Sequence, residues 1–249
     1  MLTKNQTKLI KSLHEKKNRQ ELGLFLVEGA KSVAELLTSD FKIDHLLVTE
    51  DFYGKNLDLI RPLTEIKGVP FEIISQEILE KLSTLESNNA ALAVVKQKEN
   101  NIPEIMADEI VIALDDVRDP GNLGTIIRIA DWYGVKNIIV SKNTADFYNS
   151  KTISASMGSF IRANIFYADL ADFLSKTNLP ILGALMNGEN VHTFKFPEAG
   201  ILVMGNESNG VSPEIEKLIT NKITIPRFGQ AESLNVSIAT AVIMDNWKR

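Results

Sequence analysis

The second half of the chain alternates short apolar runs with stretches in which apolar residues recur at helical spacing. The short runs are typical of buried strands, and the stretches between them are typical of helices. The predicted order is strand 110–114, helix 125–133, strand 137–140, helix 152–160, strand 164–167, helix 170–176, strands 181–185 and 201–204, helix 212–220, strand 222–225 and helix 234–247. This alternation predicts an α/β fold with a mostly parallel sheet that is covered on both faces.

The first hundred residues carry a second, smaller set of elements. A polar stretch at 96–103 (KQKENNIP) ends in proline and indicates a domain boundary. Before it, the pattern predicts helix 3–17, strand 24–27, helix 30–37, strands 43–48 and 71–74, helix 76–83 and strand 90–95. We therefore expect a compact α/β domain at 1–100 and a larger one at 101–249.

The composition, with 44% hydrophobic and 24% charged residues in 249, is that of a globular protein. The longest apolar runs are far too short to span a bilayer, and no apolar core follows the lysine-rich amino terminus as in a secretory signal. The chain has no cysteine, which excludes disulfides, thiolate catalysis and cysteine–zinc sites. Its three histidines are scattered. We expect a cytoplasmic protein with no metal site and no membrane partner.

Charge is unevenly distributed along the chain. The net charge of −5 argues mildly against a nucleic-acid binder. Residues 1–20, however, carry a balance of +5, which leaves −10 for the rest of the chain. The basic residues of this segment, set against Glu15 alone, are Lys4, Lys8, Lys11, Lys16, Lys17 and Arg19. The segment predicts either part of an RNA-binding face or a solvated helix face.

Three of the predicted strands open into polar, glycine-containing loops that precede a helix. The segments are 113–128 (ALDDVRDPGNLGTIIR), 201–213 (ILVMGNESNGVSP) and 223–237 (ITIPRFGQAESLNVS). Ligands of open α/β sheets bind at the carboxyl ends of the strands. The sequence therefore predicts one functional site that is built from all three loops.

The second loop has the glycine spacing of a phosphate-binding loop, from Gly205 to Gly210. Val211 stands where that motif requires lysine, so the triphosphate interpretation loses its main support. A G-x-G-x-x-G dinucleotide motif is absent as well. As a plain strand-to-helix turn, the loop places Ser212 as the N-cap and Pro213 at the first helical position. Neither interpretation explains Glu207.

The other two loops each combine a structural with a functional interpretation. In the third, Ser233 is expected to cap the last helix, and Asn235 then has no packing role in the first turn. In the first, Pro120 and Gly121 predict a turn, and Gly124 allows close approach of another segment. Arg128 follows on an otherwise apolar helix, where a surface arginine is the alternative to a site residue.

In this order and at these spacings, the three segments resemble motifs 1, 2 and 3 of the SpoU/TrmH family of RNA ribose 2′-O-methyltransferases. The resemblance implies a SPOUT fold, in which the carboxyl-terminal segment forms a deep trefoil knot around the cofactor pocket. Residues 25–37 and 88–95 resemble the small substrate-binding domain that precedes the catalytic domain in many members. The family further implies a homodimer formed through the knotted domain.

The resemblance also assigns roles to individual residues. It implies S-adenosylmethionine as the cofactor and RNA as the substrate, ribosomal RNA ahead of transfer RNA. The implied catalytic residues are Asn122, Arg128, Glu207, Ser233 and Asn235. The implied cofactor-binding residues are Leu185, Gly205, Ile225 and Leu234. Motif 2 departs from the family pattern at Ser208, Asn209 and Val211. Residues 154–162 resemble a further family segment, which would place Ser156 and Arg162 near the site or the dimer interface.

A guanidinium is not expected to lose its proton in a protein, so we expect Arg128 to stabilise an alkoxide or a phosphate electrostatically. Removal of the hydroxyl proton then falls to Glu207 or to solvent. Three alternatives remain open: a transfer RNA substrate, a catalytically silent RNA-binding member of the family, and a nucleotide-binding enzyme of ordinary doubly wound topology.

Overall fold

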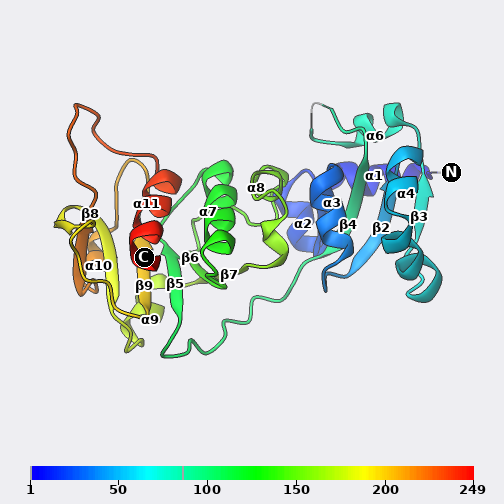
Figure 1. Ribbon diagram of the computed structural model, residues 1–249. Helices are drawn as coiled ribbons and strands as arrows, with labels where there is room; N and C mark the ends of the chain where they lie inside the picture. Colours follow the sequence, from blue (N-terminus) through cyan, green and yellow to red (C-terminus); the bar gives the residue numbers. More distant parts are fainter. Residues whose placement is uncertain (1, 86) are drawn as a thin grey trace. The chain divides into compact units, whose positions relative to one another are not determined.

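The computed structural model describes residues 2–85 and 87–249, which form two compact units (Figure 1). One unit contains the chain up to Glu99 together with Asp146–Ile161, and the other contains Asn100–Ala145 and Arg162–Arg249. The boundary near residue 100 therefore also appears in the contacts. Residues 146–161, which the sequence pattern placed in the second domain, cluster with the first unit. The assignment of RNA binding and catalysis to separate domains stays a prediction.

A four-stranded sheet in the order β1-β4-β2-β3 forms the centre of the first unit. The central strand β4 pairs antiparallel with both β1 and β2, and β3 pairs parallel with β2. The strands are β1 (Leu24–Glu28), β2 (Ile43–Val48), β3 (Phe71–Ile73) and β4 (Ala91–Lys96). The helices are α1 (Lys4–Ser12), α2 (Lys16–Leu22), α3 (Ala30–Leu37), α4 (Glu50–Lys55), α5 (Leu57–Arg61), a π-helical turn (Pro62–Ile66), α6 (Gln76–Leu82), α8 (Ser150–Ala155) and a 3₁₀ turn (Ser159–Ile161).

The single helix predicted at 3–17 is two helices, because the Arg19 side chain binds backbone carbonyl groups between them. Its Nη1 donates hydrogen bonds to the carbonyl oxygens of Leu13 (2.9 Å) and His14 (2.8 Å), just where α1 ends. The same buried guanidinium pairs with Asp146, at 2.6 Å from Nη2 to Oδ2. Arg19 is thus a structural residue and not part of the basic surface.

The second unit contains a six-stranded sheet in the order β10-β8-β9-β5-β6-β7, and every neighbouring pair is parallel. This confirms the predicted α/β fold with its mostly parallel sheet. The strands are β5 (Ile110–Leu114), β6 (Asn137–Ser141), β7 (Asn164–Ala168), β8 (Ile181–Asn190), β9 (Gly200–Met204) and β10 (Asn221–Thr224). The helices are α7 (Pro120–Trp132), α9 (Leu170–Ser175), α10 (Pro213–Glu216) and α11 (Val236–Lys248).

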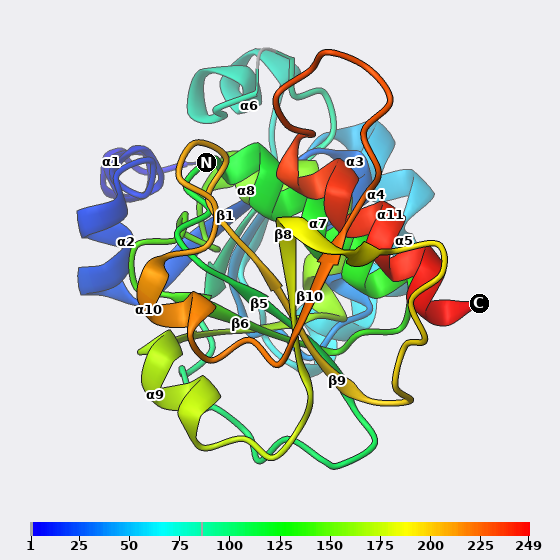
Figure 2. The same cartoon turned by 90° about the vertical axis from the view of Figure 1, so that its left-hand side faces the viewer.

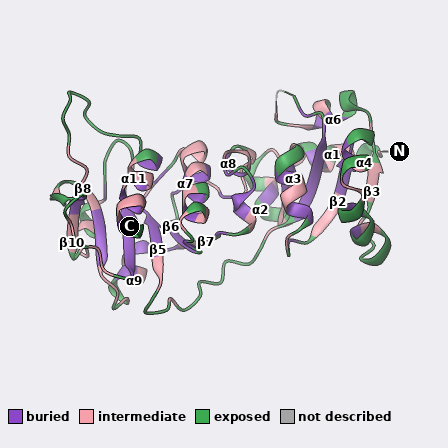
Figure 3. Ribbon diagram, viewed as in Figure 1, coloured by how far each residue is buried: buried purple, intermediate pink, exposed green. Residues whose placement is uncertain are grey.

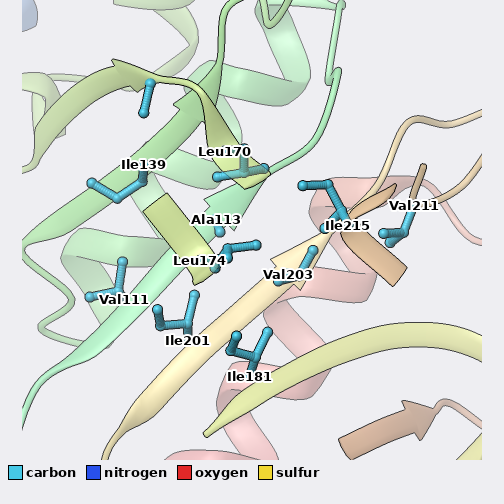
Figure 4. Packing of buried hydrophobic residues seen from close by; sticks show 11 residues of the cluster. Val111, Ala113, Ile139, Leu170, Leu174, Ile181, Ile201, Val203, Val211 and Ile215 are labelled. Carbon is cyan, nitrogen blue, oxygen red and sulfur yellow. The ribbon is translucent and has the colours of Figure 1, made fainter. Parts of the chain in front are cut away.

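Helices cover both faces of this sheet (Figure 2). On one face, alternate residues of β5 and β9, such as Val111 and Val203, pack with Leu174 of α9 and Ile215 of α10 (Figure 4). On the other face lie α7 and α11, which contact each other. The central strands β5 and β9 are almost entirely buried (Figure 3), as expected for a parallel sheet between two helical layers.

The starts of α7 and α11 differ from the sequence prediction. α7 begins at Pro120, because the Asp119 carboxylate caps it by accepting a hydrogen bond from the Asn122 amide nitrogen (2.8 Å). Pro120 and Gly121 therefore form the first helical turn and not a separate one. α11 begins at Val236 with Asn235 as its N-cap, so the expected cap at Ser233 is wrong. In residues 2–85 and 87–249, no helix combines the length and apolar character that a membrane crossing requires.

Replacing Arg19 by methionine should lower the free energy of unfolding of the first unit by about 3 kcal/mol, because the Asp146 carboxylate, whose side chain is only 15% exposed, loses its partner. Lys17→Met is a suitable control, because Lys17 pairs with Glu21 at 3.8 Å on the surface and is expected to contribute at most about 0.5 kcal/mol. Hydrogen exchange of the β1 and β4 amides measures the loss in this unit alone. Equal effects of the two substitutions would contradict the role given to Arg19.

Candidate active site

The three polar loops meet at the carboxyl edge of the second sheet. Asp115, Gly205 and Ile225 directly follow β5, β9 and β10. Because these strands and the intervening β8 run parallel, their carboxyl ends lie at the same edge. The loops after β5 and β9 are also bonded to each other. The buried Asp115 carboxylate accepts a hydrogen bond from the Ser212 amide nitrogen (2.7 Å), and Asn206 Nδ2 donates to the Asp116 carbonyl (2.7 Å).

The loop after β9 is a closed hairpin. Asn206 and Gly210 exchange two backbone hydrogen bonds of 2.9 Å, and Asn206 Oδ1 accepts from the amide nitrogens of Ser208 and Asn209. A Cβ on Gly205 would lie 2.3 Å from backbone atoms of Gly210 and Val211, so only glycine fits there. Four backbone N–H groups of the loop are used internally. This argues against a phosphate-binding loop, which needs such groups free for the ligand.

Three predicted site residues form one hydrogen-bonded chain across three loops. Asn235 Nδ2 donates to Asn122 Oδ1 (2.9 Å), and Asn122 Nδ2 donates to Glu207 Oε1 (2.7 Å). These residues come from the start of α11, the first turn of α7 and the hairpin after β9. Residues 113 positions apart in the sequence are therefore in direct contact. We call this arrangement the Asn–Asn–Glu chain.

The direction of every bond in the Asn–Asn–Glu chain is set at one end. Asn235 Oδ1 accepts hydrogen bonds from the amide nitrogens of Ser237 (2.9 Å) and Ile238 (3.3 Å), where it caps α11. Its Nδ2 must then face Asn122 Oδ1, which turns Asn122 Nδ2 toward Glu207. Within the part of the chain that the structure describes, Glu207 Oε2 accepts no hydrogen bond. That oxygen can accept a proton or a hydrogen bond from a substrate.

Arg128 lies apart from the Asn–Asn–Glu chain. It is six residues beyond Asn122 on α7, about 9 Å along the helix axis, and its side chain is exposed. It forms no ion pair with any residue in 2–85 or 87–249. Arg118, in the loop after β5, instead donates from Nε to Asp116 Oδ1 (2.8 Å), and this hydrogen bond raises the pKa of its guanidinium. Arg128 is thus the motif 1 arginine that remains available to a substrate.

The structure also places the other residues expected at the site or at the dimer interface. Ser233 and Leu234 are exposed just before α11, and the structure gives Ser233 no capping bond. Arg162 pairs with Asp131 at 2.9 Å. Ser156 is fully buried in the first unit, where its hydroxyl donates to the Ile153 carbonyl (2.7 Å), so this hydroxyl is not available to a substrate or a partner chain.

The expected cofactor residues lie along the β9–β8–β10 part of the same edge. Gly205 and Ile225 follow β9 and β10, and Leu185 lies in β8 between Gly183 and Glu189, where the register with β10 shifts. A Cβ on Gly188 would lie 2.5 Å from the backbone of Lys222 and Ile223. Leu185 and Ile225 are half-buried, and Leu234, just before α11, is 50% exposed, so each of these apolar side chains is accessible to an adenosine group. The residues therefore fit a nucleoside-type cofactor.

Comparisons with known proteins agree with this geometry. Residues 109–245 match the SpoU rRNA Methylase family, and residues 4–93 match the MRM3-like substrate binding domain. The chain is 31% identical to the 23S rRNA (guanosine(2553)-2′-O)-methyltransferase RlmP of Bacillus subtilis, over 94% of this chain and 92% of that protein.

Two solved structures extend the similarity over both units. One is a TrmH-family protein from Porphyromonas gingivalis, with a TM-score of 0.86, 32% identity and coverage of 99% of this chain and 98% of that one. The other is the AdoMet-bound rRNA methyltransferase of Sinorhizobium meliloti, with a TM-score of 0.87, 28% identity and coverage of 100% and 95%. The fold and the site define the class, and the chain belongs to the SpoU rRNA methylase family.

Sequence reasoning missed the residues that hold the loops together. Asp115 and Asn206 bind the first two loops to each other, and Asp119 sets where α7 begins. Their positions offered a signal, because all three are small polar residues in the loops that directly follow β5 and β9. The residues that the pattern could name were those with no other explanation, such as Glu207.

Replacing Asn235 by alanine should destabilise the start of α11 by about 1 kcal/mol, because Ser237 and Ile238 lose their cap. Asn235→Asp keeps the capping oxygen and should leave α11 close to its original stability. Trp247, at the far end of α11, packs on Phe196 and reports the helix by its fluorescence during urea unfolding. Equal losses of stability in both variants would show that the capping oxygen of Asn235 is not what stabilises the start of α11.

Proposed function

We propose that the chain methylates a ribose 2′-hydroxyl in ribosomal RNA and uses S-adenosylmethionine as the methyl donor. The observation that carries the proposal is the Asn–Asn–Glu chain, which joins the three family motifs at the carboxyl edge of the sheet. The cofactor supplies an electrophilic methyl group bound to sulfur. We assign its binding to Leu185, Gly205 and Ile225, from β8 and the ends of β9 and β10, and to Leu234, just before α11.

The residues of the chain would act on the ribose hydroxyl and on the charge next to it. An alcohol is a poor nucleophile, so its proton must leave as the oxygen bonds to the methyl carbon and the carbon–sulfur bond breaks. Glu207 Oε2 accepts this proton or passes it to solvent, while Asn122 holds Oε1 in place. Arg128 stabilises the developing alkoxide or an adjacent phosphate. Alignment of the reacting groups supplies part of the remaining acceleration.

Three finer features belong to the same proposal. We assign the chain to the cytoplasm, where unmodified ribosomal RNA is found. The β8 segment that approaches β10 at Gly188 is consistent with a trefoil knot in the carboxyl-terminal region.

Exposed apolar residues on α7 and α11, Trp132 (82% exposed) and Ile238 (55%), support a homodimer through the second unit. Sedimentation of the purified chain tests the dimer, and a mass of one chain at micromolar concentration would contradict it.

Labelled methyl transfer from S-adenosylmethionine to unmodified ribosomal and transfer RNA tests the function. After alkaline hydrolysis, label in alkali-resistant dinucleotides of ribosomal RNA is the expected result, because 2′-O-methylation blocks cleavage. Label in transfer RNA alone would establish the other substrate class. Cofactor binding without transfer to either RNA would favour a silent RNA-binding member, and no cofactor binding would overturn the proposal.

Arg128→Ala should lower kcat on the order of 10²- to 10³-fold, because a positive charge at the developing alkoxide is lost. The affinity for S-adenosylmethionine should stay within about twofold, because Arg128 is exposed on α7 and none of the residues proposed to bind the cofactor belongs to that helix. Isothermal titration and single-turnover kinetics separate the two effects. Arg118→Ala is the matched control and should leave kcat nearly unchanged. A large loss of cofactor affinity in Arg128→Ala would contradict the role proposed for this residue.

A further inference from the structure

Three exposed lysines form a stripe on the first helix. Lys4, Lys8 and Lys11 follow one another at spacings of four and three residues on α1, and we call them the lysine stripe. At about 100° per residue they fall within an arc of roughly 60° on one side of the helix. Lys16 and Lys17 continue the exposed basic surface onto α2.

The stripe lies opposite the face by which α1 is attached to its unit. Ile10 and Leu13 are each 1% exposed and pack in a cluster with Leu26, Leu79 and Leu92. These two positions lie about 130° and 170° around the helix from the middle of the stripe. A buried apolar face therefore holds the helix in one orientation and presents the three ammonium groups together to the outside.

The charge pattern of α1 does not favour the stability of the helix. Lys4 lies at the positive end of the helix dipole, where an acid is favourable, and the first turn contains no acid. Lys4 and Lys8, and Lys8 and Lys11, are like-charge neighbours that cost about 0.2–0.5 kcal/mol each. The capping box pairs Thr3 with Gln6, which is neutral. In residues 2–85 and 87–249, none of the three lysines has an ion-pair partner.

We propose that the lysine stripe binds the phosphate backbone of the substrate RNA. This inference rests on the proposed function and names the surface of the first unit that holds the substrate. Phosphates repeat along a nucleic-acid strand at a few ångströms, and flexible ammonium groups on adjacent helical turns can each pair with one. An anionic membrane is a poorer partner, because Ile10 and Leu13 are buried in the protein and cannot insert.

The test compares two variants of the full chain with equal charge. In the first, Lys4, Lys8 and Lys11 are changed to Gln. In the matched control, three other exposed lysines of the same unit, Lys31, Lys42 and Lys67, are changed to Gln. Binding to an unmodified 23S ribosomal RNA transcript is measured over a range of salt concentrations. The stripe variant should bind on the order of 10- to 100-fold more weakly at physiological salt. The slope of the logarithm of the binding constant against the logarithm of the salt concentration should become shallower by about 2 to 3.

The control variant should keep most of its affinity, and exchange of the stripe to arginine should preserve binding. In methyl transfer, the stripe variant should raise the KM for RNA and leave kcat and cofactor affinity unchanged. Equal weakening in both Gln variants, or an unchanged salt slope, would overturn the inference. Wild-type protein that binds the transcript with this salt dependence but transfers no methyl group would overturn the proposed function and leave the stripe intact. Stripe-dependent binding to phosphatidylglycerol vesicles without an effect on RNA would assign the surface to membranes instead.

Discussion

The hydrogen bonds made by the side-chain amide of Asn235 are the interactions on which the site depends. Its oxygen caps the start of α11 by accepting hydrogen bonds from two backbone N–H groups. Its nitrogen is thereby turned toward Asn122. One amide therefore joins the stability of a helix to the direction of the Asn–Asn–Glu chain. An aspartate at this position cannot do both, because it keeps a capping oxygen but has no donor for Asn122. The position combines a structural and a functional demand, and the two cannot be assigned to separate residues.

The parallel sheet explains why distant motifs meet. Because β5, β8, β9 and β10 run in one direction, the loops that follow them share an edge whatever their separation in sequence. Hydrogen bonds from Asp115 and Asn206 then fix the first two loops against each other. The Asn–Asn–Glu chain adds the third. A rigid scaffold with bonded loops is the arrangement expected where reacting groups must be aligned before reaction.

Much of this could be read from the sequence, and the failures have physical causes. β5 and α3 have the predicted bounds, because their apolar patterns are complete within the element. Glu207 and Asn235 stood out because no packing role explained them, and the family resemblance named Asn122. The break between α1 and α2 depends on Arg19 binding carbonyl groups and on Asp146, a partner 127 positions away. The register shift in β8 likewise depends on a tertiary contact, with β10, that leaves no periodic signal.

The most direct test of the account is the single-turnover rate of methyl transfer by Asn235→Asp, with saturating S-adenosylmethionine and ribosomal RNA. This substitution keeps the capping oxygen, and it replaces the N–H₂ donor that faces Asn122 by a carboxylate oxygen, which also carries a negative charge. We expect a folded protein with wild-type cofactor affinity and a rate at least about tenfold lower, a loss of about 1.4 kcal/mol in transition-state stabilisation. A wild-type rate in the folded variant would show that the Asn–Asn–Glu chain does not serve the reaction.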